Sequence, residues 1–139
     1  MMQYNYTAPC SKKNLADIRN FVNKILTHHF NSEIEIHHMV LAVDEVCANL
    51  MIHSHKCNPK ETIELLIDVK NQEVIFEIKD TGNGFNLKNY QEPTIKEIVV
   101  EKKKGGLGLM LVKRIMDKVE FIKNENSNVC RLKKKIPTS

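Results

Sequence analysis

The chain has 139 residues and a formal net charge of +4, with 42% hydrophobic and 27% charged residues. This is enough sequence for one domain with its own core, and the balance is that of a globular protein, not a disordered one. No apolar run is long enough to span a membrane and no signal-peptide layout opens the chain, so we expect a cytoplasmic protein without membrane contact.

Cysteines and lysine runs exclude further classes. The four cysteines are scattered, without a CxxC pair, which argues against a zinc knuckle or a redox motif. Two lysine runs, Lys102–Lys104 and Lys133–Lys135, carry part of the positive charge. Because no aromatic residues alternate with these lysines, we interpret them as a solvated edge and tail and expect no nucleic-acid partner.

The first predicted elements are a strand and a helix. Residues Met2 to Thr7 alternate between apolar and polar side chains, as in an edge strand. Apolar residues then recur at helical spacing from Leu15 to Leu26, and either Asn14 or Ser11 is the candidate N-cap.

A second helix is predicted to start at Ser32, where Glu35 three residues later completes a capping box. We expect it to end before Asn58-Pro59, because the residue before a proline disfavours helical backbone. Its apolar stripe predicts a helix that packs one side onto a flat surface, and the stripe consists of Ile36, Val40, Val43, Cys47, Leu50 and Ser54.

Two alternating segments, Ile63 to Val69 and Glu73 to Lys79, flank the tight turn Asn71-Gln72 and predict a hairpin with one buried face. Asn86 to Lys104 has no clean period and is interpreted as a loop.

A third helix is marked by Leu111 to Met116, and a second hairpin by Val119 to Ile122 and Val129 to Ile136 around Asn124 to Asn128. This order favours an α+β fold, a two-layer α/β sandwich with helices on one face of a mixed, mostly antiparallel sheet. We expect residues 1–139 to form a single domain.

Two glycine-containing segments predict a nucleotide site. Asp80 to Phe85 directly follows a strand, and an acid followed by two glycines suggests a backbone turned sharply against a flat ligand. Gly105 to Leu109 opens the third helix, where glycines suggest phosphate held by backbone N–H groups. Together they predict a base end and a phosphate end of one site.

A ridge on the second helix adds a third feature. Glu45, Asn49 and His53 lie four residues apart and share one face, and Asp44 adds a second acid. Alone, this ridge is best interpreted as a solvated helix face. An asparagine amide in mid-helix is better explained by a ligand, however, and carboxylate and amide oxygens are donors that Mg²⁺ accepts beside phosphates.

These three segments resemble conserved boxes of the GHKL ATPases, the group of gyrase, Hsp90, histidine kinases and MutL. Glu45 to His53 looks like the N box, Asp80 to Phe85 like the first glycine box, and Gly105 to Leu109 like the second. The length and element order resemble the small bacterial anti-sigma-factor serine/threonine kinases. The resemblance implies the Bergerat ATP-binding fold.

The resemblance also implies roles for single residues. Asn49 would coordinate Mg²⁺ on the phosphates of ATP, Asp80 would accept a hydrogen bond from the adenine amino group, and Glu45 would take the proton from a substrate serine. His53 would either support the Mg²⁺ ridge or cap the helix. The other implied cofactor-binding residues would let the backbone approach the base or bind phosphate: Gly82, Gly84, Lys104, Gly105, Gly106, Leu107, Gly108 and Leu109.

The implied function is an ATP-dependent kinase that sequesters a sigma factor, phosphorylates a STAS-domain anti-anti-sigma protein and forms a homodimer. A second hypothesis is an ATP-binding regulatory module without transfer, because Leu50-Met51 and Asn126 to Asn128 depart from the family's small residues and Gly-Thr. A third is the detached catalytic domain of a histidine kinase, although no helical hairpin with a phosphoacceptor histidine precedes the boxes.

The histidine pairs His28-His29 and His37-His38 invite a zinc hypothesis. Adjacent residues point in different directions on a helix, and no cysteine or carboxylate completes a known spacing. A surface or helix-end position is the favoured interpretation.

Overall fold

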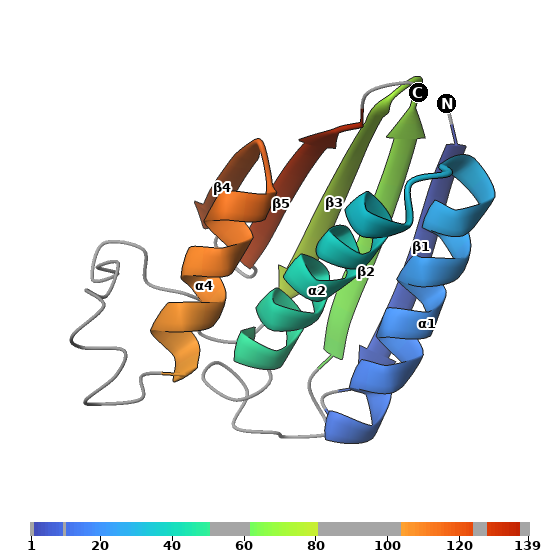
Figure 1. Ribbon diagram of the computed structural model, residues 1–139. Helices are drawn as coiled ribbons and strands as arrows, with labels where there is room; N and C mark the ends of the chain where they lie inside the picture. Colours follow the sequence, from blue (N-terminus) through green and yellow to red (C-terminus); the bar gives the residue numbers. More distant parts are fainter. Residues whose placement is uncertain (1, 10, 51–61, 81–103, 124–127, 137–139) are drawn as a thin grey trace.

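The computed structural model describes residues 2–9, 11–50, 62–80, 104–123 and 128–136. Its strands form one sheet in the order β1-β2-β3-β5-β4, and its helices lie together on one face of that sheet (Figure 1). The strands are β1 (Met2–Pro9), β2 (Thr62–Lys70), β3 (Glu73–Asp80), β4 (Lys118–Lys123) and β5 (Asn128–Lys135). The helices are α1 (Lys12–His29), α2 (Glu33–Asn49) and α4 (Lys104–Ile115).

The predicted α+β sandwich is confirmed, including both hairpins and the helix that the second glycine segment opens. One detail of the expectation was wrong for the strands described. Each neighbouring pair among them is antiparallel, so the sheet is not mixed there. In particular, β3 and β5 are antiparallel neighbours, although α4 and β4 lie between them in the chain.

Side-chain caps fix where the first two helices begin. Ser11 is the N-cap of α1, because its hydroxyl accepts from the Lys13 N–H at 3.3 Å. Asn14, the other candidate, lies inside the helix and donates from Nδ2 to the Pro9 carbonyl at 2.8 Å. Ser32 caps α2 by accepting from the Glu35 N–H at 3.3 Å, as predicted.

The hydrophobic core lies between the sheet and the helices. Buried and more exposed residues alternate along β2 and β3, so one face of each strand enters the core. Ile67 and Phe76 are register partners at its centre, and both are fully buried. The other largest fully buried side chains are Ile18, Val22, Leu26, Met39, Val43, Ile63, Leu65, Ile78 and Leu132.

Helix α2 is buried more widely than its apolar stripe predicted. Met39, Ala42 and Val46 are buried beside the stripe, whereas Val40 is only half-buried. The reason is that α2 contacts both α1 and α4 as well as the sheet, as Figure 1 shows. It is therefore the central helix, and its remaining exposed face is narrow.

The second lysine run lies in a strand and is not a solvated tail. Lys133 to Lys135 belong to β5. The central Lys134 is the register partner of the buried Val74, and its Nζ lies 3.6 Å from Glu35 Oε2. Strand alternation therefore divides the run, because it turns one lysine toward the helices and its neighbours to the other face.

Several predictions fall outside the residues that the structure describes. They are the helix end at Asn58-Pro59, residues 86–103 of the loop, and positions 124–127 of the second hairpin turn. No helix among the described residues is long and apolar enough to cross a membrane.

Candidate functional site

The described parts of the three predicted site segments meet at one end of the sheet. The C-terminal end of α2, the C-terminal end of β3 and the N-terminal end of α4 all lie at the lower end of the molecule in Figure 1. α2 contacts both β3 and α4. Residues far apart in the sequence are thus brought together, and this end of the sheet is the candidate site.

Asn49 is the last residue of α2 as its bounds are given, and Leu50 after it still has helical backbone angles, φ -62° and ψ -42°. Residues 51–61, which decide whether Asn49 lies in mid-helix, are outside the described residues. The following Leu50 N–H bonds both the Val46 and Cys47 carbonyls, and the Leu50 side chain is buried in the core. Leu50 therefore packs inward and does not crowd the end of the helix.

Asn49 is only 6% exposed, and its Nδ2 donates to the Glu45 carbonyl at 2.8 Å. A carbonyl oxygen can only accept, so the amide nitrogen must face Glu45. Oδ1 is then the side-chain atom that can bind a cation, and an amide oxygen suits Mg²⁺. One amide oxygen alone does not define a metal site, so Mg²⁺ at Asn49 stays a prediction.

Glu45 is half-buried one helical turn before Asn49. Burial is the main cause that raises the pKa of its carboxyl group, and the charge of Asp44 raises this pKa further. A carboxylate with a raised pKa binds a proton more readily than an ordinary glutamate. This is the property that a general base needs.

Arg19 is a neighbour of this site that the sequence did not single out. Its guanidinium Nη1 lies 3.0 Å from Asp44 Oδ1, which joins α1 to α2 beside Glu45. Arg19 and Asp44 are 25 residues apart, so no local spacing could have revealed the pair.

Asp80 ends β3, the central strand of the sheet, and its side chain is fully buried. Its register partners are Ile63 on β2 and Asn128 on β5. Burying a carboxyl group is costly, so its retention at a strand end needs a compensating partner. The position agrees with a polar anchor at the base of the site.

The second glycine segment lies in the first turns of α4. Lys104, Gly105, Gly106, Leu107 and Gly108 start the helix, where the first backbone N–H groups have no partner within the helix. Such N–H groups, together with the helix dipole, favour a bound phosphate. The Leu109 side chain is buried, and its role at the site stays a prediction.

Three predicted residues, His53, Gly82 and Gly84, lie outside the described residues. Their roles stay predictions.

The histidine pairs lie away from this end. His29 Nε2 is 2.7 Å from the Tyr4 hydroxyl, and burial, followed by the charge of His28, lowers the pKa of His29. His37 and His38 are exposed on α2. In the part of the chain that the structure describes, no group of three or more His, Cys, Asp or Glu side chains could hold a metal ion.

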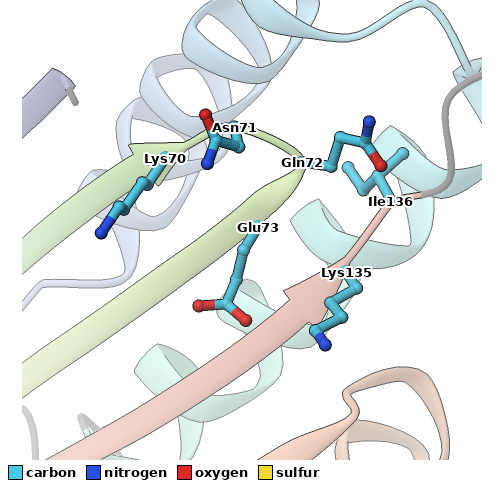
Figure 2. A pocket seen from close by; sticks show the side chains of 6 residues that line it. All are labelled: Lys70, Asn71, Gln72, Glu73, Lys135 and Ile136. Carbon is cyan, nitrogen blue, oxygen red and sulfur yellow. The ribbon is translucent and has the colours of Figure 1, made fainter.

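A hollow of about 680 Å³ lies at the opposite end of the sheet. Figure 2 shows its lining around the β2–β3 turn, where Glu73 and Lys135 are register partners on neighbouring strands. Asn71 in this turn has a positive φ of 55°, and the Ile136 N–H donates to the Gln72 carbonyl at 2.7 Å. The hollow contains none of the predicted site residues, so we do not assign the nucleotide to it.

Comparison with known proteins defines the family. The family described as "Histidine kinase-like ATPase domain" matches residues 8–134. This is most of the chain, and the chain belongs to that family.

Among curated relatives, the serine-protein kinase RsbW of Bacillus pumilus is 33% identical over 107 residues, which cover 71% of this chain and 65% of that protein. RsbW of Halalkalibacterium halodurans is 26% identical over 127 residues, which cover 88% of this chain and 76% of that protein. The chain thus spans just under two thirds of the length of the first relative.

Solved structures confirm the fold. The RsbU and RsbW domains of a Mycobacterium tuberculosis protein match with a TM-score of 0.69 and 12% identity, over 97% of this chain and 32% of that one. The Acinetobacter baumannii histidine kinase AdeS matches with a TM-score of 0.56 and 12% identity, over 99% of this chain and 70% of that one.

Proposed function

We propose that this chain is an ATP-dependent serine/threonine protein kinase whose active site lies where α2, β3 and α4 meet. The observation that carries the proposal is the half-buried Glu45, which has a raised pKa and lies one turn from Asn49. The family and the name of the RsbW relatives support it. We treat residues 1–139 as one ATP-binding domain.

Phosphoryl transfer needs mainly positioning and neutralisation of charge. The N-terminal turns of α4 would hold the phosphates by backbone N–H groups, with Lys104 as a charge partner. Asn49 Oδ1 would bind Mg²⁺, which neutralises phosphate charge when it is present. Glu45 would accept the proton of the attacking serine hydroxyl.

Asp80 would select adenine by accepting a hydrogen bond from its amino group. Because its side chain has no exposed surface, the base must displace the atoms that cover the carboxyl group. Gly82 and Gly84 would let the backbone approach the base. His53 would support the Mg²⁺ ridge formed by Glu45 and Asn49.

By resemblance, the protein substrate is a STAS-domain anti-anti-sigma protein, and the kinase sequesters a sigma factor as a homodimer in the cytoplasm. These partners are proposed from the resemblance alone.

The test is transfer of labelled γ-phosphate to a cognate STAS-domain protein by the wild type and by Glu45→Gln. We expect the wild type to label a serine and the variant to lose about 100-fold or more of the rate, with ATP affinity retained. Nucleotide binding without labelling of any protein would refute the kinase and favour the second candidate, an ATP-binding regulatory module. The observation that favours this second candidate is the complete burial of Asp80, because adenine reaches the carboxyl group only if the atoms that cover it move.

A further inference from the structure

Helix α2 has an exposed ridge that leads to Glu45. Ile34, His38, Leu41 and Glu45 follow one another at spacings of three or four residues, so their side chains share one side of the helix. Ile34 and His38 are exposed, and Leu41 and Glu45 are half-buried.

Ile34 is unusual on this surface. It is 70% exposed, and Met2 at 51% is the other exposed large hydrophobic residue in the part of the chain that the structure describes. A single exposed aliphatic side chain needs no explanation by itself. What distinguishes Ile34 is its alignment with Leu41 and the candidate general base.

The position of the nucleotide decides which part of the ridge is available. α2 ends at Asn49, one turn after Glu45, and β3 ends at Asp80. The ends of α2 and β3 and the start of α4 lie at the lower end of the molecule in Figure 1. With the nucleotide at that end, we place the protein that brings a serine to Glu45 over the half of α2 that precedes it. That half carries Leu41, His38 and Ile34.

Interface dimensions agree with this placement. A standard interface buries about 800 Å² on each partner, which corresponds to a patch of roughly 16 Å radius. Ile34 precedes Glu45 along α2 by about 16 Å of helix rise. A patch centred on Glu45 reaches Ile34, and the Arg19–Asp44 pair lies at its polar border.

We propose that the ridge Ile34–His38–Leu41 is the docking surface for the protein that carries the acceptor serine. The inference rests on the proposed kinase function. The partner presents a globular surface with an apolar contact for Ile34, in addition to the serine at Glu45. A short peptide around the serine reaches Glu45 but not Ile34.

The test compares Ile34→Asp with a matched control, Met2→Asp. Both replace an exposed apolar side chain with an acid, and Ile34→Asp should fold because an acid in the first turn of a helix is favourable. The substrates are the intact STAS-domain protein and a short synthetic peptide that contains its serine. ATP affinity is measured in parallel.

We expect Ile34→Asp to raise the KM for the intact protein about tenfold, with peptide phosphorylation and ATP affinity unchanged. Met2→Asp should match the wild type, and Ile34→Leu should retain its KM. A KM for Ile34→Asp within twofold of the wild type overturns the docking surface while the kinase stands. If the wild type labels no protein at all, the kinase proposal fails first and this inference with it.

Discussion

The two ends of the sheet have different chemistry although the same strands connect them. At one end, a helix C-terminus, a strand end and a helix N-terminus bring together Asn49, Asp80 and the glycines of α4. At the other end, a tight turn borders a hollow lined by Lys70, Glu73 and Lys135. We assign the site by the convergence of buried polar groups, because burying such groups is costly.

Paired variants at the two ends test this difference, and the largest effect is expected for Asn49. Asn49→Ala should lower the affinity for ATP with Mg²⁺ by about 10-fold to 100-fold, because it removes the amide oxygen that we propose binds the metal. Its matched control is Asn71→Ala in the β2–β3 turn, which should leave ATP affinity unchanged. Calorimetric titration with and without Mg²⁺ measures both. Equal losses in the two variants would remove the distinction between the ends.

The next largest effect is expected for Asp80. Asp80→Asn should weaken ATP binding roughly tenfold and reduce the expected preference for ATP over GTP, because it removes the charged acceptor that we propose for the adenine amino group. Glu73→Gln at the opposite end is the control. Normal ATP binding by Asp80→Asn would make the adenine assignment wrong.

A smaller effect concerns pH. Glu45 must be deprotonated to act as a base, so the transfer rate should fall as pH drops through its raised pKa. Asp44→Asn removes a neighbouring negative charge and lowers that pKa. The low-pH limb of the curve of transfer rate against pH should therefore move to lower pH. The expected gain in rate on that limb is a few-fold, because burial is the larger cause of the raised pKa. A limb that moves to higher pH would contradict this account.

The smallest effect on the site is expected for Ser32→Ala, which removes the N-cap of α2. Chemical denaturation should show a loss of about 1 kcal/mol in the free energy of unfolding. ATP affinity should stay unchanged because the cap lies at the end of α2 remote from Asn49. A loss of ATP binding in folded Ser32→Ala would show that the two ends of the helix are coupled.

The sequence was sufficient to predict most of the fold. Period-2 and helical spacing were sufficient for the strands and helices, since burial follows side-chain direction. The choice between Ser11 and Asn14 as cap required the backbone. Lys134 was misinterpreted because its partner Glu35 is distant in sequence.

At the site, the residue types of Glu45 and Asn49 were visible in the sequence. Their physical state was not. The raised pKa of Glu45 depends on burial by tertiary packing, and the orientation of the Asn49 amide depends on the Glu45 carbonyl. Arg19 was missed because its link to Asp44 crosses from one helix to another.

The central claim is that nucleotide binds where α2, β3 and α4 meet. The most direct measurement is a titration of the ¹⁵N-labelled protein with ATP and Mg²⁺, followed by backbone amide chemical shifts. We expect the largest changes at Asn49, Asp80 and Gly105 to Leu109, with little change at Lys70 to Glu73 and Lys135. Largest changes at the β2–β3 turn and Lys135 would contradict it.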